Sequence, residues 1–133
     1  MNSSALEKIK HRAIAAWNAQ DVEAVVDCYT VDLVYVDPNT RGAVEGADAM
    51  RRYLTKLFAT WQMEWMPKEL FPLDGVDGAA ALWRASFRLP HGDEVVEADG
   101  MDIVLLEGER IKRNEVYFDR AVLASLFAEV GVA

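Results

Sequence analysis

The sequence is poor in the residues that build disulfide or metal-bound frameworks. Its 133 residues include a single cysteine, Cys28, and two histidines, so it has no internal disulfide and no His or Cys spacing typical of a metal site. Cys28 lies in an apolar helical pattern and is expected to be a small packed residue. Gly-rich phosphate loops and serine-nucleophile elbows are also absent. We therefore expect neither a metal nor a cofactor.

Positive charge and long apolar runs are scarce as well. Lys and Arg number 14 against 22 Asp and Glu, which gives a formal net charge of −8 at pH 7. Nucleic acid and anionic membranes are therefore poor partners. No apolar run reaches the roughly 18 residues of a membrane span, and residues 1–12 lack the apolar core of a signal peptide. These absences predict a soluble, cytoplasmic protein.

What is present is a large apolar fraction, 52%, in a chain whose length favours one domain over residues 1–133. Helical spacing predicts a first helix over about residues 4–19 and a short second helix capped by Asp21. A third helix opens at residues 46–48 with Asp48 as its cap. A last helix begins at the cap Asp119 and ends near Gly131.

Strand patterns occupy most of the remaining chain. They predict strands at residues 31–37, 62–72, 76–89, 94–107 and 110–118, of which the last three are consecutive antiparallel neighbours. The order of elements indicates an α+β fold. We expect a cone-shaped, curved antiparallel sheet with the three helices of the N-terminal half covering its concave face, and a short C-terminal helix. Such a half-cone encloses one pocket.

A carboxylate interrupts the apolar face of the strand at residues 94–107. Successive side chains of a strand point to opposite faces. The residues that share a face with Asp102 are Val96, Ala98, Gly100, Val104 and Leu106. Burying an unpaired carboxylate costs several kcal/mol or keeps it protonated. Asp102 is therefore a candidate functional residue, although a structural carboxylate bonded to a helix end or an arginine fits the same pattern.

A second candidate carboxylate ends an earlier strand. Asp37 shares a face with Leu33 and Tyr35 and is followed by Pro38. Asp before Pro at the end of a strand is commonly a turn residue. Because functional sites often pair two carboxylates in a cleft, Asp37 is also a candidate partner for Asp102.

Several segments together resemble the nuclear-transport-factor-2-like superfamily, particularly its SnoaL-like and ketosteroid-isomerase-like branch. They are AAWNAQDVEAVVDCY, the strand end VDP, the helix start GADAMRRYL and the terminal EVYFDR. The resemblance covers nearly the whole chain. It implies a cone-shaped fold, a deep apolar pocket for a small hydrophobic molecule and, often, a homodimer formed through the sheet faces.

The resemblance also implies roles for the two carboxylates. In ketosteroid isomerases the Asp of the strand-ending Asp-Pro is the general base, which corresponds to Asp37. A protonated Asp on the third long strand donates to the developing oxyanion, which corresponds to Asp102. The family's oxyanion-hole Tyr is replaced here by Ala13 and its supporting Tyr by Leu54. Asp102 would therefore have to stabilise the developing oxyanion alone. The Arg-x-Asp pair of limonene-epoxide-hydrolase-like members would need Arg at Gly100.

Aromatic and inward-facing residues complete the expected site. The last strand is expected to point Lys112, Asn114, Val116 and Phe118 inward, as the resemblance implies. The aromatic members of the expected site also fit a role in the core. The substrate-binding residues that we expect are Trp17, Tyr53, Phe58, Trp83, Phe87, Asn114, Val116 and Phe118.

The leading hypothesis is a cofactor-independent enzyme that moves a proton next to a carbonyl in an apolar pocket, as a ketosteroid-isomerase-like isomerase or a polyketide-cyclase-like enzyme. Asp37 would be the base and Asp102 the acid or hydrogen-bond donor. One alternative is a non-catalytic module that binds a small hydrophobic ligand. Another is a dimer-forming interaction domain, which predicts a filled cone and a homodimer through the sheet face.

Overall fold

The computed structural model describes residues 3–129, and the predicted helix end near Gly131 lies outside them. The elements are α1 (Ser3–Ala19), α2 (Val22–Val26), β1 (Tyr29–Val36), β2 (Val44–Glu45), α3 (Ala47–Thr60), β3 (Gln62–Pro72), β4 (Gly78–Arg88), β5 (Val96–Glu107), β6 (Arg110–Tyr117), the 3-10 helix η1 (Arg120–Leu123) and α4 (Ala124–Glu129). None of these helices is both long and apolar enough to cross a membrane.

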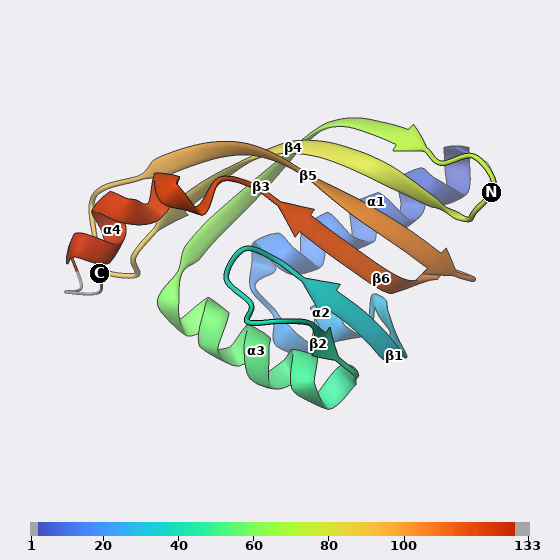
Figure 1. Cartoon of the computed structure of the whole chain (residues 1–133), viewed down its shortest axis with the longest axis horizontal. Coiled ribbons are helices and arrows are strands. Elements are labelled where there is room, and N and C mark those ends of the chain that lie inside the picture. Colours follow the sequence, from blue (N-terminus) through green and yellow to red (C-terminus); the bar gives the residue numbers. More distant parts are fainter. Residues whose placement is uncertain (1–2, 130–133) are drawn as a thin grey trace.

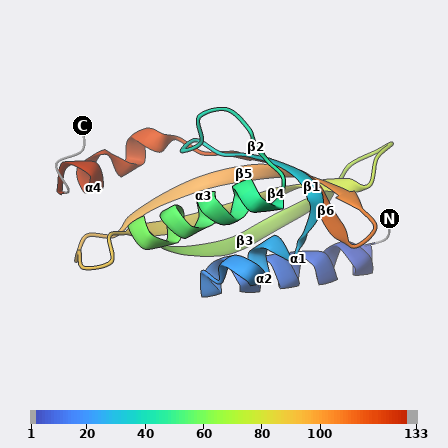
Figure 2. The same cartoon turned by 90° about the horizontal axis from the view of Figure 1, so that it is seen from below.

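The strands form one sheet in the order β2-β1-β6-β5-β4-β3. All neighbouring pairs are antiparallel except β1 and β6, which run parallel. The sheet arches over α1, α2 and α3, and α4 lies at the far end from the start of α1 (Figure 1). The view from below shows the same arrangement (Figure 2). The predicted α+β architecture and the β4-β5-β6 meander are confirmed, whereas β2 was not predicted.

The end of α1 covers the free edge of β3. Asn18 accepts a hydrogen bond from the Trp65 backbone N–H at 2.8 Å and donates one to the Trp65 carbonyl at 3.2 Å. Gln20 accepts from the Met63 backbone N–H at 2.8 Å. An edge strand leaves such backbone groups unpaired. The two amide side chains therefore replace a neighbouring strand and fix α1 against the sheet.

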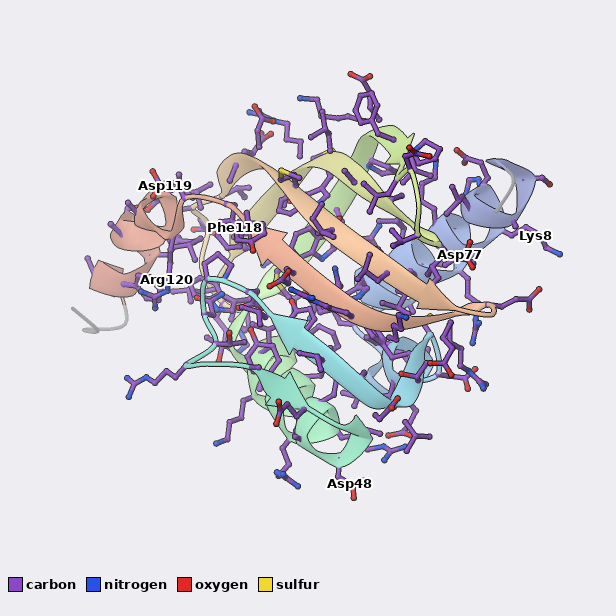
Figure 3. The ribbon with its side chains drawn as sticks, turned by 45° about the vertical axis from the view of Figure 1, so that its right-hand side comes forward. Lys8, Asp48, Asp77, Phe118, Asp119 and Arg120 are labelled. Atoms are coloured by element: carbon purple, nitrogen blue, oxygen red, sulfur yellow. The ribbon has the colours of Figure 1, made fainter. Side chains whose placement is uncertain are left out.

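Two of the three predicted helix caps are observed. The Asp21 and Asp119 carboxylates each accept a hydrogen bond from a backbone N–H of the first turn, at 3.1 and 2.9 Å. The prediction for Asp48 is wrong, because Gly46 is the N-cap of α3 with a φ of 87° that glycine adopts without strain. Asp48 instead points to solvent (Figure 3) and pairs with Arg51 at 2.9 Å.

The predicted facing of the last strand fails at Lys112. The pairing of β6 with β5 shifts by one residue between Ile111 and Arg113, so Lys112 is the extra residue of a β-bulge. Ile111 is buried in its place and Lys112 is exposed. Asn114 and Val116, beyond the bulge, are buried as predicted.

Aromatic side chains fill the end of the cone under the C-terminal helix. Phe87 and Phe118 lie 5.3 Å apart between ring centroids, and Trp61 packs edge-to-face on Phe127 at 5.5 Å. Leu126 of α4 is completely buried. Burial of these rings supplies a large share of the core and leaves the opposite end of the sheet for the site.

Candidate active site

A cavity of about 290 Å³ lies between α1 and the concave face of the sheet. Its wall is formed mainly by apolar and aromatic side chains: Ala13, Ile14, Trp17, Tyr29, Tyr35, Trp65, Ala79, Ala81, Trp83, Val104, Leu106, Ile111 and Val116. Charged side chains of α1 and β3 also border it: Glu7, Lys10, Lys68 and Glu69. An apolar cavity of this size suits a small molecule.

The strand β5 carries Asp102 into this cavity. Asp102, Val104 and Leu106 all line it, so the predicted facing of the strand is confirmed. Across β4, Trp83 pairs with Gly100, and a side chain at Gly100 would overlap the indole ring. Glycine at this position therefore allows Trp83 to lie beside Asp102 in the wall.

A chain of hydrogen bonds links Asp102 on β5 to Asn114 on the adjacent β6 and, through Asn114, to Tyr29 on β1. The Asn114 Nδ2 donates to Asp102 Oδ2 at 2.8 Å and to the Ile103 carbonyl at 3.1 Å. The Tyr29 hydroxyl donates to Asn114 Oδ1 at 2.8 Å. All three side chains line the cavity. The carboxyl thus has a fixed partner in an apolar surrounding.

Burial sets the acid–base properties of this carboxyl. Removal from water raises the pKa of Asp102 from its ordinary 3.8 to about 6, although hydrogen bonds from Asn114 and Trp83 act in the opposite direction. Burial also raises the pKa of Tyr29, which keeps its hydroxyl protonated as a donor. Asp102 can therefore exchange a proton near neutral pH.

The structure places Asp37 elsewhere. Its carboxylate is buried and accepts hydrogen bonds from the Tyr35 hydroxyl at 2.7 Å and from the Tyr53 hydroxyl. The backbone N–H groups of Asn39 and Thr40 donate to its other oxygen at 2.6 and 3.1 Å. Burial and the nearby Asp37 charge raise the pKa of both tyrosines. Asp37 is absent from the cavity lining, so the two predicted carboxylates do not share one wall.

The predicted substrate-binding residues divide into two groups. Trp17, Trp83, Asn114 and Val116 line the cavity. The others lie outside its lining: Tyr53, Phe58, Phe87 and Phe118.

This second group packs behind the wall. Phe58 meets Trp17 edge-to-face at 5.8 Å, and Phe118 lies 6.2 Å from Trp83 between ring centroids. Phe87 is buried against Phe118. Strand and helix periodicity places these aromatic residues inside the cone, but only packing decides which of them reach the cavity surface.

The aromatic cavity residues that were not predicted as site residues are Tyr29, Tyr35 and Trp65. The first strand was predicted to begin at residue 31, whereas Tyr29 begins β1. Starting the strand there would have placed Tyr29 on the same face as Tyr35. Trp65 follows Met63 on the inner face of β3, and alternation along that strand could have identified it.

The charged and polar residues do not gather into a metal site. Among residues 3–129, no group of three or more His, Cys, Asp or Glu side chains lies close enough to hold an ion. The uncharged or buried polar residues of the cavity wall are Tyr29, Tyr35, Asp102 and Asn114, and the charged residues at its border are Glu7, Lys10, Lys68 and Glu69. Their chemistry is that of proton transfer and hydrogen bonding.

Solved structures show the same fold. A Bacillus subtilis protein provisionally described as an isomerase superposes with a TM-score of 0.84 at 13% identity, covering 96% of each chain. TerC, co-crystallised with polyporic acid, gives 0.80 at 14% identity over 93% of this chain and 98% of TerC. SalBIII, an epoxide hydrolase/cyclase-like enzyme in pyran ring formation in salinomycin, gives 0.74 at 21% identity, covering 86% and 91%.

Sequence comparison gives the family. No curated protein sequence matches this chain significantly. Residues 11–114 match the SnoaL-like domain model, a stretch that includes α2, α3 and nearly all of the sheet. The resemblance read from the sequence is therefore confirmed, and this chain belongs to the SnoaL-like domain family.

Proposed function

We propose that this protein is a cofactor-independent enzyme that moves a proton next to a carbonyl group of a small apolar molecule, with Asp102 as the proton-transfer group. One observation carries the proposal: the Asp102 carboxyl lines an apolar cavity, is held by Asn114 and has a pKa raised to about 6. A base whose pKa lies near the working pH is an efficient catalyst of proton transfer.

Similar folds support a small-molecule substrate. TerC was crystallised with polyporic acid, and SalBIII is described as an epoxide hydrolase/cyclase-like enzyme. The aromatic cavity wall of this chain, with Trp17, Trp65 and Trp83, suits a flat or ring-shaped apolar body.

The hydrogen bonds of the wall restrict the substrate further. Tyr29, Tyr35 and Asn114 line the cavity, and each already donates within the protein. A developing enolate would therefore receive little help from these three side chains. A carbon between two carbonyl groups spreads the negative charge over both oxygens of the substrate itself. We therefore propose a small apolar substrate whose reactive C–H lies between two carbonyl groups.

The proposed step is balanced without a cofactor. The Asp102 carboxylate takes the proton from the carbon, and the C–H electron pair forms the enolate. Return of the proton to another carbon completes an isomerisation. Alternatively, the enolate carbon attacks a further carbonyl of the same molecule, outside the pair that holds the charge; the oxygen of that carbonyl then takes the proton, and a ring closes.

Proton exchange tests the proposal before the natural substrate is known. A panel of ring-containing β-keto esters and simple ketones would be incubated in D₂O, and loss of the α-proton signal would be followed by NMR. We expect the protein to accelerate exchange of the β-keto esters. The Asp102→Asn variant should lose at least about 100-fold of that acceleration, in line with removal of a general base.

The assay must separate lack of catalysis from lack of binding. Binding of each compound would be measured in parallel by tryptophan fluorescence, because three tryptophans line the cavity. β-Keto esters that bind without exchange, or equal exchange of them by wild type and Asp102→Asn, would overturn the catalytic role of Asp102.

A non-catalytic binding module is the second candidate. The observation that favours it is the placement of Asp37, whose carboxylate is hydrogen-bonded outside the cavity lining. The cavity then presents one carboxyl instead of the two that the sequence suggested. This candidate predicts ligand binding with no proton exchange for any member of the panel.

We also propose that the convex face of the sheet forms a homodimer interface. Met101, Ile103 and Leu105 alternate with the cavity residues of β5 and therefore lie on this face, where they are half-buried. Charged pairs flank them, with Arg84 bonded to Glu97 at 2.6 Å. An apolar strip with a charged border is typical of a specific protein contact.

A further inference from the structure

The Asn114 side chain has one orientation that satisfies all of its neighbours. Its Nδ2 lies 2.8 Å from Asp102 Oδ2 and 3.1 Å from the Ile103 carbonyl oxygen, and its Oδ1 lies 2.8 Å from the Tyr29 hydroxyl. Both amide protons and the amide oxygen are therefore used. Asn114 is also buried, so water has little access to replace these bonds.

The reverse orientation of the amide is disfavoured by the backbone. Rotating the Asn114 amide by 180° would place its oxygen against the Ile103 carbonyl, where two acceptors would face each other. It would also place that oxygen against the Asp102 carboxylate. Ile103 thus selects the donor orientation, and the Tyr29 hydroxyl reinforces it because a buried tyrosine remains protonated.

We infer that Asn114 and Tyr29 are positioning residues that hold Asp102 as a hydrogen-bond acceptor, and so as the base of the reaction. The inference rests on the proposed function and assigns the residues behind its reacting group. Asn114 donates to the carboxylate directly, and Tyr29 acts through Asn114. A donor fixed in this way favours the ionised form of a carboxyl. The resemblance had implied a protonated Asp102 that donates.

The surroundings of Asp102 contain other titratable groups. Tyr29 and Tyr35 line the cavity from β1, and charged residues border it from α1 and β3: Glu7, Lys10, Lys68 and Glu69. Burial, Asn114 and Trp83 act on the pKa of Asp102. A change in this pKa can therefore be assigned to Asn114 only if variants of neighbouring residues are compared.

The test measures the titration of the Asp102 carboxyl directly. Its carboxyl ¹³C signal would be followed by NMR against pH in wild type, Asn114→Leu and Tyr29→Phe, with Asp102→Asn identifying the signal. We expect Asn114→Leu to raise the midpoint by about one pH unit or more, the size expected for losing a hydrogen bond to a charge. Tyr29→Phe should raise it by a smaller amount.

The matched control is Tyr117→Phe, which removes the same hydroxyl from an exposed residue of β6. It should leave the midpoint unchanged. The pH profile of proton exchange should move with the NMR midpoint in each variant. Because the NMR reading needs no substrate, it tests the positioning roles even if no exchange is found.

Two outcomes would overturn the inference. One is an Asp102 midpoint that stays within 0.2 pH units of wild type, on the order of the precision of such a titration, in both Asn114→Leu and Tyr29→Phe. The other is a fall in the midpoint. If Asn114→Leu fails to fold, the volume-conserving Tyr29→Phe variant decides alone.

Discussion

Trp83 lies directly over the Cα of Gly100 on the adjacent strand, so that a Cβ at Gly100 would overlap the indole ring. The same Cβ would come within 2.8 Å of the Tyr117 carbonyl oxygen. We expect Gly100→Ala to shift the indole and lower the free energy of unfolding by about 1–3 kcal/mol, the usual cost of overpacking. Urea unfolding measures the loss.

A double variant tests whether overlap with the Trp83 ring causes the loss of stability in Gly100→Ala. Trp83→Phe leaves a smaller ring at the pair, so Trp83→Phe/Gly100→Ala should be less destabilised than the sum of the two single variants. Strict additivity would show that the backbone contact with Tyr117, and not the indole, sets the cost.

The raised pKa of Asp102 makes stability depend on pH in a defined direction. The folded state binds this proton more tightly than the unfolded state, since the pKa is about 6 instead of 3.8. Stability is therefore lost as the pH rises from about 4 through 6. Two units of pKa correspond to about 3 kcal/mol. Asp102→Asn removes the charge, so its free energy of unfolding relative to wild type should rise by about this amount from pH 4 to pH 7.

Urea unfolding of both proteins at several pH values measures this difference. Asn at position 102 can still accept the Asn114 hydrogen bond, so the variant is expected to fold. Parallel pH curves for the two proteins would contradict a raised Asp102 pKa.

Asp37 is expected to matter more for stability than for proton exchange. Its loss would leave the buried hydroxyl of Tyr35 and the partly buried hydroxyl of Tyr53 without their acceptor, at a cost of about 2–4 kcal/mol in Asp37→Ala. Tyr53→Phe should cost only about 1 kcal/mol, because Asp37 keeps its other donors. Thermal and urea unfolding measure both variants.

The exchange assay then compares the two carboxylates. Asp37→Asn should retain exchange within about 10-fold of wild type, whereas Asp102→Asn should not. A folded Asp37→Asn protein as inactive as Asp102→Asn would restore the two-carboxylate mechanism predicted from the sequence.

Filling the cavity should block ligand binding without unfolding the protein. Ala81 lines the cavity, whereas Ala80 is its neighbour on the opposite face of β4. We expect Ala81→Leu to weaken binding of a bicyclic probe such as 2-naphthol at least about 10-fold, or about 1.4 kcal/mol. Ala80→Leu should bind normally. Quenching of tryptophan fluorescence measures the binding, and equal affinity of the two variants would exclude this cavity as the binding site.

The proposed dimer predicts a concentration-dependent mass. Ile103→Glu places a charge on the convex face of β5 without touching the cavity side of the strand. Sedimentation equilibrium should give a dimer for wild type and a monomer for this variant, because a charge in an apolar contact is costly. A wild-type monomer at micromolar concentration would refute the interface.

The sequence by itself determined the helices, the long strands and the face on which most of their side chains lie; β2 and Lys112 were the exceptions. Alternation along residues 94–107 placed Asp102 on the inner face, and the structure shows it in the cavity wall. Local chemistry also gave the caps at Asp21 and Asp119. These features depend on residues close together in the chain, so periodicity and turn preferences are enough to find them.

Tertiary structure alone decided which side chains are hydrogen-bonded to one another. Tyr29 reaches Asn114 across 85 positions of sequence, and Tyr53 of α3 reaches Asp37 from a separate element. The bulge at Lys112 changed which residues of β6 face inward. A period of two fixes the face of a side chain, but its partner depends on how distant elements pack. That packing placed Asp102 in the cavity wall and left Asp37 buried and hydrogen-bonded outside the cavity lining.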